Sequence, residues 1–115
     1  MELYRLKAHE LQDKLRKKEV SATEITQSLL KRIDTVEDKV QAFITQTREA
    51  ALAQARLVDE KIARGEQLAP LAGLPGVLKD NICSKGTKTT CGSKILENFV
   101  APYDATVTKR LNEQD

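Results

Sequence analysis

A lysine followed by aspartate and asparagine ends an apolar stretch, and its amine has the chemistry to act as a base. The stretch covers residues 71–78 and predicts a turn that enters a buried strand, after which Lys79, Asp80 and Asn81 follow. An ammonium group is costly to desolvate unless it is paired or neutral. Two interpretations are therefore open. In the first, Lys79 is an ordinary ammonium that reaches solvent or pairs with Asp80. In the second, it is buried as a neutral amine that serves as a general base.

Other side chains suited to catalysis or metal binding are scarce. His9 is the single histidine, which largely excludes His-rich metal sites and histidine-dependent triads, so hydrolysis would need a different base. Cys83 and Cys91 are separated by seven residues, and without a secretion signal we expect reduced thiols rather than a disulfide framework. Because no histidine lies near Cys91 in the sequence, we expect a small buried thiol there rather than a nucleophile.

A polar loop follows the lysine. Residues 83–94 are dense in serine, threonine and glycine, whose hydroxyl groups can satisfy backbone groups or contact a substrate. The surroundings of Gly86 lack the spacing of a phosphate-binding loop. The loop therefore indicates polar contacts close to Lys79 but does not indicate a nucleotide site.

Composition places the chain among globular proteins. Its 115 residues carry 19 Lys+Arg and 17 Asp+Glu, and the formal charge of +2 is too small to indicate nucleic-acid binding by itself. Hydrophobic residues make up 40%, in short runs that argue against both disorder and a membrane-spanning helix. Residues 1–5 contain no apolar signal region. We therefore expect a cytoplasmic protein with no membrane partner.

The two halves of the chain differ in composition. Residues 1–68 hold most of the charged side chains, one glycine and no proline, which is typical of helices. Residues 69–115 hold the other four glycines, all three prolines and both cysteines, which predicts short strands and loops. The expected fold class is α/β, with N-terminal helices followed by the first strands of a mixed sheet.

Three helices are predicted in the first half. Leucines at near-helical spacing indicate the first helix, and they are Leu3, Leu6, Leu11 and Leu15. The basic residues within 14–18 are expected to form its solvated end rather than an RNA contact. Ser21 and Glu24 form a capping box that begins the second helix. An apolar stripe continues behind this box as a buried helix face, made by Ile25, Leu29, Ile33 and Val36.

The remainder of the first half predicts a short extended piece and a third helix. Residues 40–45 are expected to form a short strand or an extended turn. Apolar residues at helical spacing predict a helix over residues 47–64. Gly65 is well placed to end this helix in a left-handed conformation.

Three segments and the helical opening together resemble the amidase signature family. The segments are Gly73-Leu74-Pro75 with Leu78-Lys79-Asp80-Asn81-Ile82, then residues 89–99, then residues 103–107. The Lys-Asp-Asn motif marks the wider family. The Thr-Thr-Cys-x-Ser-Lys-Ile-Leu stretch is similar to the glutamine-hydrolysing subunit of tRNA-dependent amidotransferases. Gly92 stands where alanine or serine is more often expected, which exchanges one small residue for another.

The resemblance implies a Ser–cis-Ser–Lys hydrolase in which Lys79 is the base. The lysine deprotonates a bridging serine, which activates a nucleophilic serine that attacks the side-chain amide of glutamine. Ammonia passes to a partner subunit, which uses ATP and Mg²⁺ to convert Glu-tRNA(Gln) to Gln-tRNA(Gln). The expected partners are subunits B and C of a heterotrimer, with tRNA bound mainly through a partner. No cofactor or metal is expected on this chain itself.

Both serines of that mechanism are expected beyond Asp115, because Ser84 and Ser93 do not match the family's positions. We therefore expect residues 1–115 to be the N-terminal part of a single amidase domain, and the isolated chain to be inactive and marginally stable. Two alternatives stay open: another amidase signature enzyme acting on a small amide, and a non-catalytic truncated interaction module.

Overall fold

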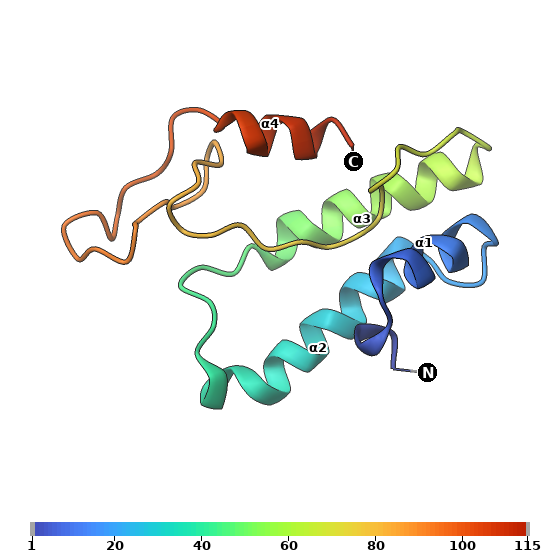
Figure 1. Ribbon diagram of the computed structural model, residues 1–115, viewed down its shortest axis with the longest axis horizontal. Helices are drawn as coiled ribbons and strands as arrows, with labels where there is room; N and C mark the ends of the chain where they lie inside the picture. The colour runs from blue at the N-terminus through green and yellow to red at the C-terminus, as the bar shows by residue number, and fades with distance from the viewer. Residues whose placement is uncertain (1, 115) are drawn as a thin grey trace.

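Four α-helices and one short 3-10 helix provide the regular structure of residues 2–114. The computed structural model describes residues 2–114 and is shown in Figure 1. The elements in chain order are η1 (Leu3–Arg5), α1 (Ala8–Arg16), α2 (Ala22–Val40), α3 (Arg48–Ala63) and α4 (Thr106–Asn112). The helices α2 and α3 run antiparallel and pack against each other, and η1 packs on α2. A long irregular segment follows α3 and leads to α4.

The start of α2 is held by two sets of hydrogen bonds. The predicted capping box is confirmed, because Glu24 N–H donates to Ser21 Oγ at 3.0 Å and Ser21 N–H donates to Glu24 Oε2 at 2.8 Å. Asp59 of α3 supplies a second cap. It accepts from Ala22 N at 2.7 Å, from Thr23 N at 3.0 Å and from Thr23 Oγ1 at 2.6 Å. A carboxylate at this end is also favoured by the helix dipole, so the cap joins α3 to α2.

The predicted helix boundaries hold in part. The first helical pattern is broken after η1. Lys7 is the N-cap of α1, and its N–H donates to Glu10 Oε2 at 2.7 Å. The helix α3 lies within the predicted range, and Gly65 has φ +74° beyond its end, as expected. The strand or extended turn expected over residues 40–45 is wrong as a strand, because α2 continues to Val40 and a loop follows.

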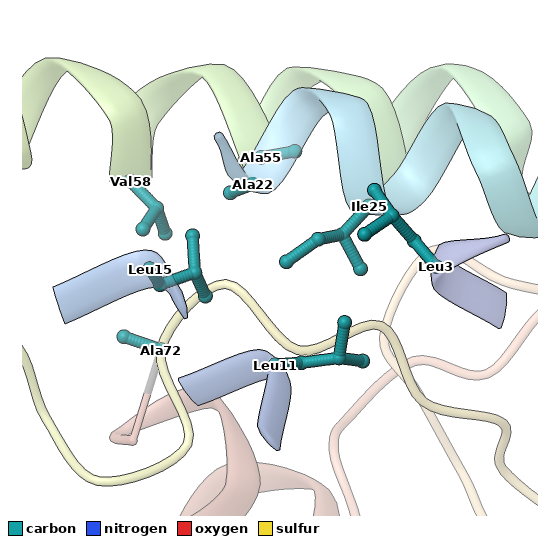
Figure 2. Close-up of a cluster of buried hydrophobic side chains, with 8 residues drawn as sticks. All are labelled: Leu3, Leu11, Leu15, Ala22, Ile25, Ala55, Val58 and Ala72. Atoms are coloured by element: carbon teal, nitrogen blue, oxygen red, sulfur yellow. The ribbon is translucent and has the colours of Figure 1, made fainter. Parts of the chain in front are cut away.

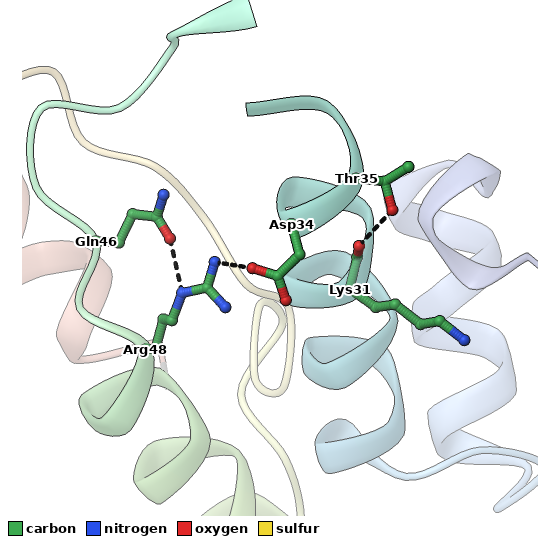
Figure 3. A network of polar contacts seen from close by, with 5 residues as sticks. All are labelled: Lys31, Asp34, Thr35, Gln46 and Arg48. Atoms are coloured by element: carbon green, nitrogen blue, oxygen red, sulfur yellow. Dashed lines mark hydrogen bonds and ion pairs between the residues drawn. The ribbon is translucent and has the colours of Figure 1, made fainter. Parts of the chain in front are cut away.

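The connection between α2 and α3 is closed by an arginine. Figure 3 shows Arg48, at the start of α3, donating to Gln46 Oε1 at 2.7 Å and to the Asp34 carboxylate on α2. The hydrogen bond from Arg48 holds the pKa of Asp34 below its usual value. All three side chains are surface groups, so the network sets the geometry of the loop more than it adds stability.

The hydrophobic core is small and lies where the helices meet the irregular segment. Figure 2 shows its eight buried residues, which are Leu3, Leu11, Leu15, Ala22, Ile25, Ala55, Val58 and Ala72. Leu15, Ile25 and Val58 are each only 1% exposed. The first three helical segments, α3 and the chain after it therefore share one core.

Gly73 lets the irregular segment enter that core. Its φ is +77°, and a Cβ atom there would lie 3.0 Å from Leu15 Cδ1, 3.2 Å from Ala22 Cβ and 3.3 Å from Val58 Cγ1. Both the backbone conformation and the lack of space therefore favour glycine. Nearby, Gln12 Nε2 of α1 donates to the carbonyl oxygen of Pro70. The chain is fixed on the helical layer just before it reaches Lys79.

The predicted mixed sheet is wrong for residues 2–114. The one β interaction within this range is an isolated antiparallel bridge between Lys88 and Val100. Residues 71–78 form a turn and an extended piece instead of a buried strand, and Val77 is 72% exposed. An extended segment becomes a strand only when a second backbone shares its hydrogen bonds, and no other part of residues 2–114 forms β pairing with this one.

A helix at the end of the described chain was not predicted. Residues 69–115 were expected to form strands and loops, whereas α4 occupies Thr106–Asn112. Within residues 2–114, none of the helices combines the length and the apolar character needed to cross a bilayer.

Replacement of Gly73 by alanine is expected to destabilise the fold more than the same change at Gly65. Both glycines have positive φ, but only Gly73 has side-chain atoms close to the new Cβ. Urea unfolding should show a loss of about 1 kcal/mol for Gly65→Ala and of about 1–3 kcal/mol more for Gly73→Ala. Equal losses for the two variants would contradict the close packing at Gly73.

Removal of the Asp59 carboxylate is expected to weaken the contact between α2 and α3. Asp59→Ala leaves the donors of Ala22 and Thr23 without their acceptor, at a cost of about 2–3 kcal/mol in the free energy of unfolding. The matched control is Glu60→Ala, an exposed acid at the next position of α3, expected within about 0.5 kcal/mol of the parent. A similar effect of both changes would argue against a specific cap.

Candidate functional site

Lys79 stands at the first position of a tight turn. Its carbonyl oxygen accepts from Ile82 N at 3.0 Å, so Asp80 and Asn81 occupy the centre of the turn. The Lys79 side chain is exposed and forms no ion pair within residues 2–114. The described chain therefore has neither the buried amine nor the pairing with Asp80 that the sequence left open, and Lys79 reaches solvent. Its role as a base stays a prediction.

The carboxylate of Asp80 binds the chain ten residues later. Oδ1 accepts from Thr90 N at 3.0 Å, and Oδ2 accepts from the Thr90 hydroxyl and, at 3.4 Å, from Gly92 N. The carbonyl oxygen of Asp80 also accepts from Cys91 N at 2.9 Å. Side chain and main chain of the residue next to Lys79 are thus bound to the same short segment.

These contacts lower the pKa of Asp80. The hydrogen bond from the Thr90 hydroxyl is the largest cause, followed by the one from Thr90 N, and both stabilise the ionised carboxylate. Partial desolvation acts in the opposite direction and is outweighed. Asp80 is therefore an anion held by neutral donors.

The segment that receives Asp80 is a turn with two left-handed residues. Cys91 has φ +52°, Gly92 has φ +68°, and Ser93 N donates to Thr90 O at 2.8 Å. Positive φ at both central residues is the arrangement of a type I′ turn, which points successive N–H groups to one side. The predicted burial of Cys91 is wrong: its side chain is exposed at the tip of this turn, while its N–H donates inward to Asp80. Both Cys91 and Cys83 are free thiols.

A hairpin-like loop holds the turn in place. Gly86 N donates to Ala101 O at 2.9 Å, Ala101 N to Thr87 O at 3.0 Å, and Thr89 N to Phe99 O at 3.0 Å. Thr89 and Thr90 are each only 4% exposed. The loop hydroxyls were expected either to satisfy backbone groups or to contact a substrate. The Thr90 hydroxyl does the first, because it accepts from Gly92 N and donates to Asp80.

The helix α4 is fixed to the chain just after the Lys79 turn. Cys83 O accepts from Ala105 N at 2.9 Å and from Thr108 Oγ1 at 2.7 Å, and Thr108 is 2% exposed. Asp104 Oδ1 accepts from Lys85 N at 2.6 Å. The supporting roles of Asp80, Asp104 and Thr108 were missed in the sequence, because each depends on a partner at least ten residues away.

The described chain shows no second site near Lys79. A hollow of about 300 Å³ lies between the α1–α2 connection and the end of α3, and its walls include Val20, Asp59 and Ile62 but not Lys79. Across residues 2–114, no three His, Cys, Asp or Glu side chains gather as a metal-binding group. The Lys79–Ile82 turn, with Asp80 on the 90–93 turn, is the candidate site.

Comparison with known proteins identifies the family. The family model described as "Amidase" matches residues 24–115. This chain belongs to the amidase signature family. It is 55% identical over 113 residues to the glutamyl-tRNA(Gln) amidotransferase A-subunits of Carboxydothermus hydrogenoformans and Moorella thermoacetica, covering 98% of this chain and 23% of each relative. The A-subunit of Desulforamulus reducens is 52% identical over 115 residues, which cover 24% of its length.

Two solved structures share the fold of this chain. A structure of a vestigial protein complex, described as revealing the evolutionary origins of an s-triazine catabolic enzyme, matches with a TM-score of 0.90 and 33% identity over 95% of this chain and 24% of that one. A bacterial aryl acylamidase of the amidase signature family matches with a TM-score of 0.90 at 22% identity, over 96% of this chain and 23% of that one, which supports the fold alone. This amidase segment spans about a quarter of the length of the relatives it matches.

The depressed pKa of Asp80 predicts how the site responds to acid. A carboxyl group whose pKa is lower in the folded state stabilises the fold above its unfolded pKa of about 3.9, and this contribution is lost as the pH falls through the lower folded value. The stability difference between the parent and Asp80→Asn should therefore be constant near neutral pH and shrink below about pH 4. Urea unfolding at several pH values measures it, and a difference that grows on acidification would contradict the assignment.

Proposed function

We propose that this chain is part of a glutamine-hydrolysing amidase, the A-subunit of a tRNA-dependent amidotransferase that supplies ammonia to convert Glu-tRNA(Gln) to Gln-tRNA(Gln). The observation that supports this most directly is the 52–55% identity over almost the whole chain to relatives named as that subunit. The Lys-Asp-Asn motif lies within the matched part, and Lys79 is its proposed base.

The proposed reaction is acyl transfer through serine. The neutral amine of Lys79 accepts a proton from a bridging serine, which in turn takes the proton of the nucleophilic serine. The nucleophile attacks the side-chain amide carbon of glutamine, ammonia leaves with the returned proton, and water hydrolyses the acyl-enzyme to glutamate. Both serines are proposed to lie beyond Asp115 in the full-length protein, since Ser84 and Ser93 do not match their positions in the family.

Further subunits are proposed to carry the other steps. ATP and Mg²⁺ would be bound by a partner subunit, which activates the glutamate on the tRNA and receives the ammonia. The partners would be subunits B and C, with tRNA contacted mainly through a partner and the complex located in the cytoplasm. Because the chain spans about a quarter of its relatives, all of these roles belong to the proposal for the full-length protein.

The exposed position of Lys79 is compatible with this role if further chain covers it. The described segment exposes large apolar side chains on the same irregular half, and Ile95 is 94%, Val77 72% and Tyr103 63% exposed. An apolar surface of this kind is typical of a face that packs against other protein. We propose that the rest of the amidase domain packs on this face. Desolvation by that packing would favour the neutral amine that a base requires.

Lys79→Ala is expected to abolish glutamine hydrolysis in the full-length protein. Loss of a general base lowers the rate by about 10²–10⁴-fold, measured as glutamate or ammonia release by the full-length protein in complex with its partners. Lys85→Ala is the matched control, an exposed lysine in the neighbouring loop, and should keep the parent rate. Retained turnover of Lys79→Ala would overturn the assignment of the base.

The same assay separates the two other candidates. An amidase signature enzyme acting on a small amide would hydrolyse its substrate without tRNA or partner subunits. A non-catalytic interaction module would bind the partners without any lysine-dependent turnover. Dependence of amide transfer on tRNA and on both partners is expected for the proposed function.

A further inference from the structure

We propose that Thr90 and Asp80 are positioning residues for Lys79: the Thr90 hydroxyl seats the Asp80 carboxylate on the 90–93 turn and thereby fixes the backbone from which the lysine projects. The inference rests on the proposed function, because it assigns these residues to the reaction of the same site. It concerns a contact between two segments, one of which carries the base while the other forms the turn opposite it.

The geometry leaves the residue after Lys79 little freedom. Asp80 is bound at its main-chain oxygen by Cys91 N and at its side chain by Thr90 and Gly92. The peptide that joins Lys79 to Asp80 also belongs to the turn closed by Ile82 N. Lys79 is therefore joined directly to a residue that is bound at both its main chain and its side chain.

The contact is part-buried, and its donors and acceptors pair with one another. Thr90 is 4% exposed, and its Oγ1 donates to Asp80 Oδ2 while accepting from Gly92 N at 3.2 Å. Gly92 N also points to Asp80 Oδ2 at 3.4 Å. The hydroxyl thus uses its one donor and one of its two acceptor sites within the cluster, so its proton is not available to a substrate.

A second consequence concerns charge. Asp80 carries the carboxylate nearest to Lys79 in the sequence, and an ion pair between them would favour the protonated ammonium, which cannot accept a proton. The structure directs this carboxylate to Thr90 and Gly92 instead, and Lys79 forms no ion pair in the described part of the chain. The same contact that holds the backbone therefore also occupies the adjacent carboxylate, which forms no ion pair with the proposed base.

The test compares Thr90→Val with Thr90→Ser in the full-length protein in complex with its partners. Valine keeps the shape of threonine but has no hydroxyl, whereas serine keeps the hydroxyl. We expect Thr90→Val to lower kcat for glutamine hydrolysis about ten- to a hundredfold, the scale of a misplaced catalytic group, with KM unchanged. Thr90→Ser should restore most of kcat. A merely structural role would lower the folded fraction or Tm without this division between kcat and KM.

Three outcomes would overturn the inference. They are a parent-like kcat for Thr90→Val, a fall in kcat that only follows the loss of folded protein, and a Thr90→Ser variant as slow as Thr90→Val. If Thr90→Val does not fold, Asp80→Asn serves instead, because it keeps the side-chain shape and removes one of the two acceptor oxygens. The expectation for Asp80→Asn is the same fall in kcat at unchanged KM.

Failure of the proposed function is distinguishable from failure of this inference. If Lys79→Ala keeps its glutaminase rate, the proposed base is wrong whatever Thr90 does. If Lys79→Ala is inactive while Thr90→Val has parent kinetics, the base stands and the positioning role is wrong. When both single variants are slow, adding Thr90→Val to Lys79→Ala should cause no further loss, because the hydroxyl acts only through the lysine. A full additional loss in the double variant would contradict the inference.

Discussion

The close approach of Gly73 to the helical core is the constraint on which the rest of the described chain depends. A side chain at this position would lie 3.0–3.3 Å from atoms of Leu15, Ala22 and Val58, which belong to α1, α2 and α3. The three helices can therefore close around the irregular segment only because no side chain intervenes. Asp59 holds α2 and α3 in register at the same junction, by capping the turn that contains Ala22. The helical layer and the irregular segment that leads to Lys79 are therefore joined at this junction.

From that point onward, polar contacts rather than apolar burial organise the chain. Asp80 binds the 90–93 turn, the hairpin-like loop supports that turn, and Cys83 binds α4 through Thr108. Each contact joins segments ten or more residues apart with donors that are largely main-chain N–H groups. Such contacts are directional, so they fix the course of the chain with few large buried side chains. This explains how residues 75–105 keep a defined path without a sheet.

The sequence predicted what depends on neighbours along the chain. The capping box of Ser21 and Glu24, the range of α3 and the left-handed Gly65 all follow from local patterns of residues within a few positions of one another. Strands were predicted from apolar runs punctuated by Gly and Pro, but pairing needs a second backbone that local pattern does not specify. Cys91 was expected to be a small buried thiol because no histidine lies near it in the sequence, whereas its position in the turn exposes the side chain. The motif drew attention to Lys79 but did not reveal that Asp80 binds Thr90.

The candidate site separates two requirements of a lysine base. The first is the position of the backbone that carries the lysine, which the contacts of Asp80 and Ile82 hold within the described segment. The charge state depends on desolvation, which requires surface that covers the amine, and Lys79 is exposed. Exposed apolar side chains on the same half of the chain, such as Val77 and Ile95, are the proposed contacts of such a cover. A segment organised in this way holds the backbone of its lysine in place, while the neutral amine that the proposed chemistry requires depends on further protein that covers the side chain.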